Sequence, residues 1–295
     1  MAITLSASDA PSPPLSARLS PPQVWGIALL APYLLVFLAF VVYPVGYGLW
    51  LARHPSSYVA LYHDPIFARA AVNTLIFLVI GINIKMLIAL FLSGFFAQQR
   101  PWIRWLSVIF ILPWAVPSIP TILSVRFMLN PEWGVVNQLI FKFTGDDGPN
   151  WLNDPAVALA MAIGVHIWKS LPFWTLILLT GRLAISHDLY EASDVDGANW
   201  WQRIWYVTLP MMRNIIAITT LFSLIVTFAN FDIVRILTAG GPLDHTHIFA
   251  TWAFRVGIEG SDIPLGASVS LFMVPILAVA AIFILRDITK RGNES

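Results

Sequence analysis

Four ionisable side chains lie within long apolar stretches of the sequence and are the first candidates for chemistry. They are Lys85, His166, Lys169 and Asp232. In an apolar membrane segment such a group costs roughly 2.5–3.5 kcal/mol on insertion scales, so it faces a cavity or a partner. Lys85 fits two interpretations equally well, a structural role (snorkelling or an ion pair) and a lining role. For Lys169 we expect a lining role or pairing with Asp232. Trp168 and the break at Pro172 adjoin it.

No catalytic or metal-binding motif accompanies these residues. The sequence has no Cys, no His-Glu-x-x-His and no Gly-x-Ser-x-Gly. His245 and His247 form an isolated pair, which we interpret as a surface feature of a loop rather than a metal site. The sequence also lacks Gly-x-x-x-x-Gly-Lys-Ser/Thr, so the chain has no loop to hold the phosphates of ATP. We therefore predict no catalytic residue, no metal ligand and no cofactor in this chain.

The composition indicates an integral membrane protein. Of 295 residues, 58% are hydrophobic and 11% are charged, and the mean hydropathy is +0.74. A soluble domain averages about 25% charged residues, so a water-soluble enzyme is excluded. The 17 Lys and Arg against 16 Asp and Glu leave no basic excess for nucleic acid. We expect an all-α membrane protein in contact with lipid.

Apolar stretches of about 20 residues predict membrane-spanning helices. Six qualify, at about 25–51, 71–97, 103–125, 156–180, 214–237 and 265–286. We therefore expect a six-helix membrane domain over 25–286, a disordered Pro- and Ser-rich head over 1–24 and a short tail over 287–295. Pro113, Pro117 and Pro120 interrupt the third stretch, and we expect the freed carbonyls either to line an interior seam or to kink the helix.

The distribution of Lys and Arg predicts the orientation, since cytoplasmic loops carry the excess. With a cytoplasmic amino terminus, nine basic residues lie inside and six outside. Those inside are Arg18, Arg100, Arg104, Arg182, Arg203, Arg213, Arg286, Lys290 and Arg291. We therefore expect both termini, and the long internal loop 181–213, to face the cytoplasm.

The loop 181–213 contains a predicted short helix. Ser186 is a suitable N-cap and Gly197 a suitable stop. Helical spacing places four residues on one face, and two of them are small enough for another protein to approach closely. They are Leu189, Ala192, Ser193 and Asp196. We interpret this helix as a docking element for a partner. A second amphipathic stretch runs from Asn199 to Leu209 and is predicted to end at Pro210, with its aromatic residues at the headgroup level.

Motifs in and around this loop resemble a known family. Glu191-Ala192-Ser193, Asp196-Gly197-Ala198 and Leu209-Pro210 look like the conserved cytoplasmic loop of binding-protein-dependent ABC importer permeases, with Ser193 in place of a second Ala. Further segments look like the carbohydrate-importing, maltose-type branch. They are Asn73-Thr74-Leu75, Leu112-Pro113, Asn130-Pro131-Glu132-Trp133-Gly134, Trp168-Lys169-Ser170-Leu171-Pro172 and Phe231 to Pro242, which includes Leu237-Thr238-Ala239-Gly240-Gly241-Pro242. Asn214 stands where many members of the family have Pro.

The resemblance implies a permease subunit in a bacterial inner membrane. It implies a second, homologous permease subunit as partner, two ATPase subunits that bind ATP and Mg²⁺, and an extracytoplasmic solute-binding protein. It also implies that the loop couples the permease to the ATPase. The implied coupling residues are Leu189, Glu191, Ala192, Ser193, Asp196, Gly197, Leu209 and Pro210.

The resemblance also implies a sugar or polyol substrate. Proteins bind sugars with aromatic faces and planar polar side chains, and residues of these types occur in and beside the predicted spans. The candidates for the substrate pathway are Asn73, Asn83, Trp168, Lys169, Asn230, Phe231 and Asp232. Two other functions stay open at this point, a self-contained secondary transporter of a small polar solute and an intramembrane enzyme. A secondary transporter has no need of a docking helix, and no catalytic motif supports an enzyme.

Overall fold

The computed structural model describes residues 21–98 and 100–292, with side chains described for 25–98 and 100–286. Most of the predicted head (1–20) and the end of the predicted tail (293–295) lie outside the described residues. The described part contains helices and no strand, so the predicted all-α fold is confirmed. It divides into two units, residues 1–50 and 51–295.

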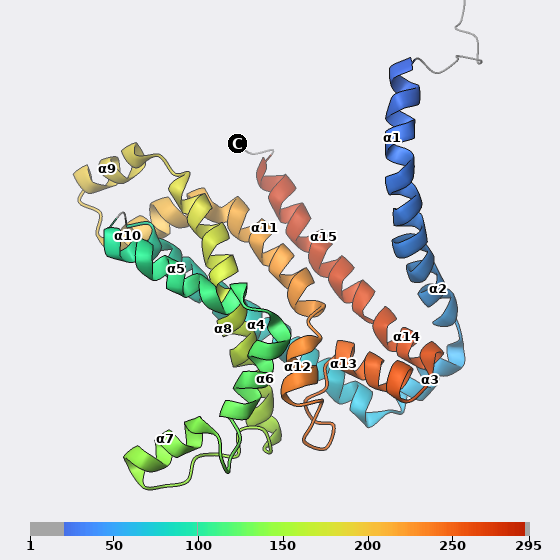
Figure 1. Ribbon diagram of the computed structural model, residues 1–295. Coiled ribbons are helices and arrows are strands. Elements are labelled where there is room, and N and C mark those ends of the chain that lie inside the picture. Colours follow the sequence, from blue (N-terminus) through green and yellow to red (C-terminus); the bar gives the residue numbers. More distant parts are fainter. Residues whose placement is uncertain (1–20, 99, 293–295) are drawn as a thin grey trace, which may run out of the picture. The chain divides into compact units, whose positions relative to one another are not determined.

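In the first unit, one apolar helix is built from three consecutive segments (Figure 1). They are α1 (Pro21–Phe37), the π-helical turn η1 (Leu38–Val42) and α2 (Tyr43–Leu51). Residues Trp25–Leu51 are long and apolar enough to cross a membrane. Large apolar side chains are exposed all around this helix, as expected for a segment that contacts lipid. Tyr43, Tyr47 and Trp50 stack in series near its end.

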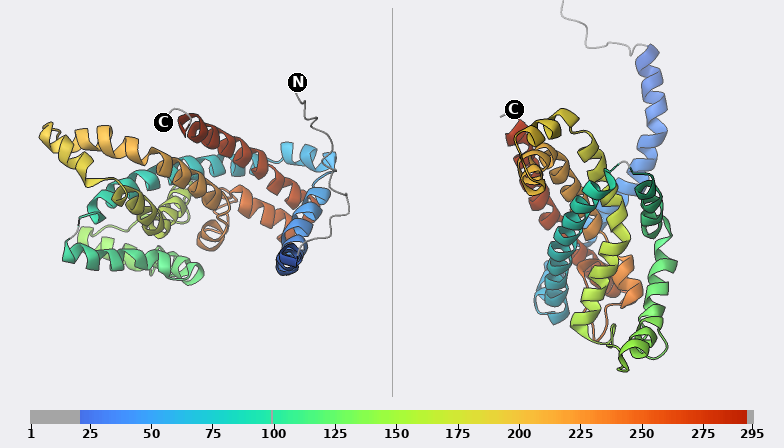
Figure 2. Two further views of the ribbon diagram at one scale, coloured as in Figure 1. Left: turned by 90° about the horizontal axis from the view of Figure 1, so that it is seen from above. Right: turned by 90° about the vertical axis from the view of Figure 1, so that its left-hand side faces the viewer.

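The second unit is a helix bundle. Its helices are α3 (Pro55–Tyr62), α4 (Pro65–Phe96), α5 (Pro101–Ala115), α6 (Ser118–Met128), α7 (Val135–Thr144), α8 (Pro155–Leu183), α9 (His187–Val195), α10 (Trp200–Arg203), η2 (Ile204–Thr208), α11 (Leu209–Phe228), α12 (Asp232–Leu237), α13 (Phe249–Phe254), η3 (Arg255–Glu259), α14 (Ile263–Leu271) and α15 (Met273–Gly292). Helices α7 and α9 lie at opposite ends of this unit in Figure 1 and in the right-hand view of Figure 2.

Aspartate residues begin several of these helices. The carboxylates of Asp64, Asp154 and Asp262 accept hydrogen bonds from the backbone N–H groups of Ile66, Val157 and Leu265. A proline near the first helical position follows each of them. Proline is favoured there because its missing N–H would have no partner within the helix. Local sequence therefore sets the starting points of α4, α8 and α14.

Two of the predicted spans are broken in the structure. The span predicted over 103–125 is the helix pair α5 and α6, which bend by 93° relative to each other. The span predicted over 214–237 is interrupted between Phe228 and Asp232, where α11 ends and α12 begins. Including the bent pair, the described residues contain up to six helical segments that satisfy the length and composition of membrane spans.

Pro210 does not end a helix, contrary to the sequence prediction. Helix runs without interruption from Trp200 through η2 into α11, because the π-helical turn changes the hydrogen-bond register just before the proline. In this turn the N–H of Leu209 bonds to the carbonyl of Ile204, five residues earlier. Such a wide turn accommodates a proline that cannot donate to the usual i−4 carbonyl.

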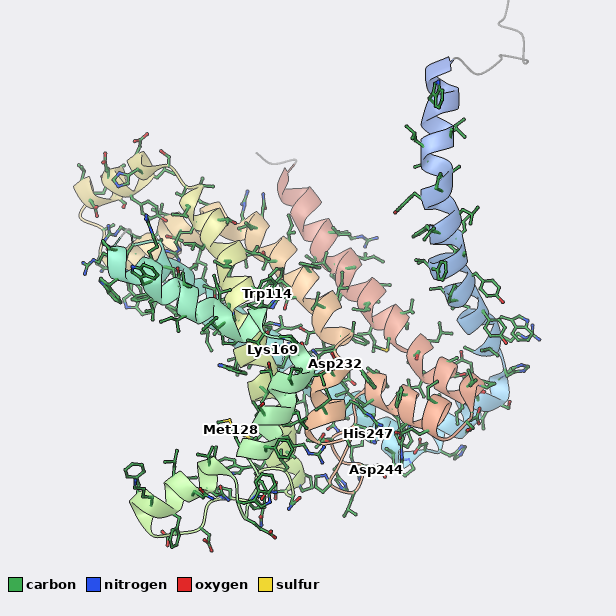
Figure 3. The ribbon with its side chains drawn as sticks, viewed as in Figure 1. Trp114, Met128, Lys169, Asp232, Asp244 and His247 are labelled. Atoms are coloured by element: carbon green, nitrogen blue, oxygen red, sulfur yellow. The ribbon has the colours of Figure 1, made fainter. Side chains whose placement is uncertain are left out.

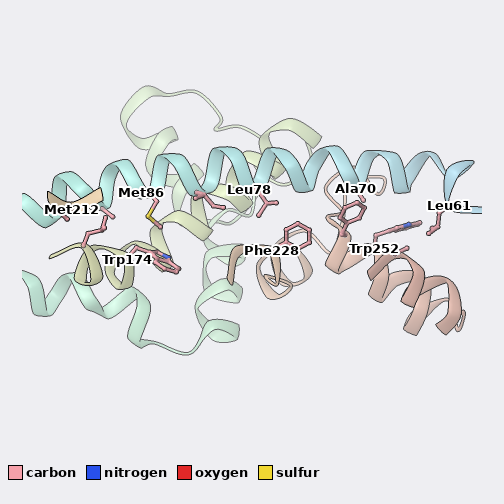
Figure 4. Packing of buried hydrophobic residues seen from close by; sticks show 13 residues of the cluster. Leu61, Ala70, Leu78, Met86, Trp174, Met212, Phe228 and Trp252 are labelled. Atoms are coloured by element: carbon pink, nitrogen blue, oxygen red, sulfur yellow. The ribbon is translucent and has the colours of Figure 1, made fainter. Parts of the chain in front are cut away.

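The apolar core of the bundle is organised around α4, which packs against α8 and α11. Figure 4 shows this cluster, in which α4 runs beside Trp174 of α8 and Phe228 of α11. Helices α8 and α11 approach closely at Gly181, where an added Cβ would lie 2.7 Å from the side chain of Ile215. Without a hydrophobic driving force between helices in lipid, small residues that permit such close packing stabilise the bundle.

A buried polar cluster joins the same three helices. The Nζ atom of Lys85, whose side chain is 0% exposed, lies 3.1 Å from His166 Nε2 and 3.1 Å from Thr227 Oγ1. It also lies 5.0 Å from the ring centroid of Trp174. Of the two interpretations of Lys85, the structure favours the structural one, because its ammonium group is enclosed between α4, α8 and α11.

Candidate functional site

The short helix predicted within the loop 181–213 is α9. The hydroxyl of Ser186 accepts a hydrogen bond from the N–H of Asp188, as expected of an N-cap. Gly197 adopts a left-handed backbone with φ of +74°, and the N–H of Ala198 bonds to the carbonyl of Ser193 across the helix end. Both predicted boundary residues are therefore confirmed.

One residue of the predicted docking face points towards the protein instead. Ser193 is 8% exposed and donates its hydroxyl to the carbonyl of Tyr190. Tyr190 contacts Thr208 of η2, with 3.1 Å between their hydroxyl oxygens. The side of α9 that carries Ser193 therefore packs on η2, and the predicted four-residue face is only partly available to another protein.

The rest of the α9 surface, including the other three residues of the predicted face, is exposed and acidic. Its exposed residues are Asp188, Leu189, Glu191, Ala192, Asp194, Val195 and Asp196. Asp194 pairs with Arg203 at 2.7 Å, and Glu191 contacts the His187 ring at 2.8 Å. Val195 is 88% exposed. This surface combines apolar side chains with exposed carboxylates, two of which pair with Arg203 and His187, and so suits a partner with apolar and basic groups. The predicted residues Leu209 and Pro210 lie on α11 and not on this surface.

A second arrangement of polar groups lies where α5 meets α6. The Nζ atom of Lys169 on α8 donates hydrogen bonds to the carbonyls of Pro113 (3.0 Å) and Val116 (2.8 Å). In a continuous helix these carbonyls would bond to the N–H groups four residues later. Those residues are Pro117 and Pro120, which have no N–H. Lys169 therefore supplies donors to the two carbonyls that these prolines leave unpaired.

This finding bears on the pairing expected for Lys169 and leaves the lining role a prediction. Its hydrogen bonds are to the bend between α5 and α6, so the predicted pairing with Asp232 is not found among the described residues (Figure 3). Trp168, the preceding residue, lines an apolar groove of about 520 Å³ along the same bend. The prolines of the third span both kink the helix and leave carbonyls that turn inward.

Three of the predicted pathway residues lie together in the break between α11 and α12. The side-chain oxygen of Asn230 is buried and has no hydrogen-bond partner among the described residues. The Phe231 ring lies 5.0 Å from that of Phe254, and Asp232 is exposed as the first residue of α12. Helix α12 packs on α6 and α8, so this break adjoins the elements that carry the bend.

The remaining two pathway candidates, Asn73 and Asn83, make hydrogen bonds away from the break. The amide of Asn73 donates to the carbonyls of His245 (2.7 Å) and His247 (3.0 Å), so it holds a loop in place. Asn83 is exposed, and its amide bonds to the carbonyl of Val79 on its own helix. Neither amide group is directed at the break between α11 and α12 by its hydrogen bonds.

The loop 238–248 contains a buried histidine that the sequence analysis misassigned. His247, predicted as a surface feature, is 1% exposed. Its ring nitrogens lie 3.1 Å from Thr251 Oγ1 and 3.2 Å from the Asp244 carboxylate. Gly240, with φ of +85°, lies against the ring so closely that a Cβ there would be 2.1 Å from it. The Gly-Gly sequence is the signal that could have indicated this close approach.

The environment of His247 determines its protonation. Burial lowers its pKa, and the neighbouring Asp244 carboxylate partly offsets this shift; the more distant Arg255 lowers the pKa and Glu259 raises it. No group of three His, Cys, Asp or Glu residues in the described part of the chain could hold a metal ion. His247 therefore acts as a neutral, hydrogen-bonded core residue of the loop.

Comparison with known proteins defines the class of this fold. Residues 85–292 match the family model described as "Binding-protein-dependent transport system inner membrane component", so the chain belongs to this family. It is a multi-pass inner-membrane transport subunit, and the prediction of a binding-protein-dependent ABC importer permease is confirmed.

Particular relatives refine this result. The trehalose/maltose transport system permease protein MalF of Thermococcus litoralis is 28% identical over 83% of this chain and 87% of its own length. The sulfoquinovosyl glycerol transport system permease protein SmoG of Agrobacterium fabrum is 28% identical over 89% and 90%. A chain from the crystal structure of a bacterial ABC transporter for the acidic polysaccharide alginate superposes with a TM-score of 0.80, at 25% identity over 90% and 96%.

We predict that Lys169→Met lowers the free energy of unfolding by about 1–3 kcal/mol, because the carbonyls of Pro113 and Val116 lose their donor while the side-chain volume is kept. Thermal unfolding of the purified chain in detergent, followed by tryptophan fluorescence, measures the effect. Lys142→Met on the exposed surface of α7 is the control. Equal melting temperatures for the Lys169 and Lys142 variants would contradict the assignment.

We also predict that the loop 238–248 opens in acid. The folded pKa of His247 is lowered, so the open loop takes up a proton more readily than the closed one, and closure weakens as the pH falls below about 6.5. The protection of this loop against hydrogen–deuterium exchange, expressed relative to the intrinsic exchange rate at each pH, should therefore decrease between pH 7 and pH 5. In His247→Gln the pH dependence should largely disappear, whereas His245→Gln should retain it. A loop whose exchange has the same pH dependence with and without His247 would refute this.

Proposed function

We propose that the chain is one of two permease subunits in an ATP-driven importer for a sugar or a sugar derivative, and that α9 couples it to a separate ATPase. The observation that carries the proposal is the exposed acidic and apolar surface of α9, which is held on η2 by the hydrogen bond between Tyr190 and Thr208. The sequence contains no phosphate-binding loop of its own. The energy for transport then comes from ATP and Mg²⁺ bound by the partner.

The nature of the substrate is supported by the relatives. Their names specify trehalose and maltose, sulfoquinovosyl glycerol and, for the solved structure, alginate. The break between α11 and α12 offers a planar amide, an aromatic ring and a carboxylate in three consecutive residues. The side-chain oxygen of Asn230, buried without a partner among the described residues, is suited to accept a hydrogen bond from a sugar hydroxyl.

The proposed partners follow from the same arrangement. A second permease subunit would complete the pathway, and two ATPase subunits would contact the two coupling helices. An extracytoplasmic solute-binding protein would deliver the sugar. A solved neighbour, 23% identical to this chain, is described as a complex with an alginate pentasaccharide-bound periplasmic protein. In this proposal both termini and α9 face the cytoplasm.

We predict that combining Glu191→Lys and Gly197→Asp prevents recovery of the ATPase with a tagged chain. The first substitution reverses a charge on the exposed surface of α9, and the second places a side chain where φ is +74°. Affinity purification from membranes followed by an ATPase assay measures the result. Glu132→Lys in the exposed turn after α6 is the control. A self-contained secondary transporter would be indicated if no ATPase accompanies the unmodified chain, or if the double variant imports normally.

We further predict that Asp232→Ala impairs uptake without affecting assembly. Loss of a hydrogen bond to a charged group costs about 1.5–3 kcal/mol, so uptake should fall about tenfold or more. Uptake of labelled sugar into vesicles and recovery of the complex are measured together. Asp146→Ala, in an exposed loop, provides the matched control. Normal uptake by the Asp232 variant would remove this carboxylate from the pathway.

A further inference from the structure

Two adjoining hollows lie at the end of the bundle where α4 and α8 end and α5 begins. The larger, of about 590 Å³, is walled by the last residues of α4, the first turns of α5 and the leucine side chains Leu176, Leu179 and Leu183 of α8. The second, of about 540 Å³, lies between the ends of α4 and α8 and the start of α9. Ala97 and Leu183 line both. Their volumes fall within the range of about 300–1,000 Å³ that is usual for ligand sites.

The charges around these hollows are of one sign. Arg100 and Arg104 line the larger hollow, and Arg182 lines the smaller one. None of the described residues that line either hollow is Asp or Glu. His187, at the edge of the smaller hollow, contacts the carboxylate of Glu191 at 2.8 Å. The hollows therefore combine apolar walls with a basic rim.

The guanidinium group of Arg182, beside the smaller hollow, is held in place by two hydrogen bonds. Arg182 is fixed by hydrogen bonds from Nε to Ser93 Oγ (3.2 Å) and from one terminal nitrogen to the carbonyl of Leu90 (3.3 Å). An arginine has five N–H donors in a planar fork that matches phosphate oxygens. Arg182 is thus held in a defined orientation. These two bonds use two of its five N–H donors, so the others can bind a phosphate oxygen.

The position of two arginines on α5 adds a second electrostatic argument. Arg100 is the residue that precedes the helix, and Arg104 lies in its first turn. The amino-terminal end of a helix carries partial positive charge, so cations are unfavourable there and anions are favourable. Two arginines at this end therefore destabilise the folded chain when no anion is bound. A bound anion would offset both the dipole and the guanidinium charges.

Aromatic side chains place this end of the bundle at the lipid headgroups. Trp102 and Trp105 of α5 are exposed, as are Trp200 and Trp201 of α10. Exposed Trp residues gather at the membrane–water interface, where an apolar ring meets a polar surrounding. A ligand that reaches both the basic rim and the leucine wall at this depth must have an anionic head and an apolar tail.

We infer that the hollows at the ends of α4 and α8 bind an anionic phospholipid, with its phosphate among Arg100, Arg104 and Arg182. Its acyl chain lies along Leu176, Leu179 and Leu183 of α8. Basic pockets between membrane helices that bind acidic lipid headgroups are a known mode of lipid recognition. The site is separate from the break between α11 and α12, and its smaller hollow reaches the first turns of α9 at His187 and Tyr190.

The test uses the full-length chain, with any subunits that accompany it, in nanodiscs of phosphatidylcholine alone or with phosphatidylglycerol. Thermal unfolding and native mass spectrometry measure stabilisation and retained lipid. We expect phosphatidylglycerol to raise the melting temperature and to be retained preferentially. A single arginine contributes roughly a fivefold change in binding to anionic lipid, so Arg104→Gln should weaken retention about fivefold and the double variant Arg100→Gln, Arg104→Gln further.

Arg213→Gln on α11 is the matched control, since it removes one exposed arginine that lines neither hollow. In phosphatidylcholine alone the Arg104 variant should be at least as stable as the unmodified chain, which excludes a folding defect. Inorganic phosphate, added to the phosphatidylcholine nanodiscs, tests whether the arginines bind a free anion instead of a lipid headgroup. The inference is overturned if phosphate stabilises as strongly as phosphatidylglycerol, if Arg213→Gln weakens retention equally, or if the variants lose a protein subunit instead of lipid.

Discussion

The hydrogen bonds from Lys169 to the bend between α5 and α6 are the interaction on which the shape of the bundle depends. Pro117 and Pro120 remove two N–H donors from one membrane segment, and an unpaired carbonyl in hydrocarbon costs several kcal/mol. The ammonium group of Lys169 satisfies both carbonyls from a neighbouring helix. A 93° bend inside the membrane region is tolerable because another helix provides the missing donors.

The same constraint explains where the other polar side chains lie. Lys85 meets His166 and Thr227 between three helices, and Asn73 holds two carbonyls of the loop 238–248. Each of these groups would be costly in lipid and is paired within the bundle. The side-chain oxygen of Asn230 departs from this pattern, because it is buried without a partner among the described residues. The hydroxyls of Thr219 and Ser223 are also buried without a partner among the described residues, but Asn230 is the one of the three that lies in the break between α11 and α12, which is a reason to place a ligand there.

Much of this arrangement could be predicted from local sequence. The N-cap at Ser186 and the stop at Gly197 depend on neighbouring residues alone, so they were predicted and found. The bend at Pro117 depends on α8, which lies far away in the sequence. The burial of His247 and the inward orientation of Ser193 depend on how neighbouring segments fold back on each other, which residue types alone do not specify. The continuity of α10 and α11 through Pro210 depends on a π-helical turn, and nothing in the residue types of Ile204–Thr208 distinguishes this turn from an ordinary helix.

Helix α8 connects the elements discussed above and continues through Pro172, where the sequence suggested a break. Its 29 residues extend over roughly 44 Å at 1.5 Å per residue, and only three residues separate its last turn from the first residue of α9. Lys169 lies at its middle, and Arg182 near its end bonds to α4. Helix α8 therefore links α9 directly to the bend at Lys169, and Arg182 bonds the end of α8 that is nearer α9 to α4. In the proposed importer, this continuous helix is the route by which a displacement of α9 reaches the proline bend.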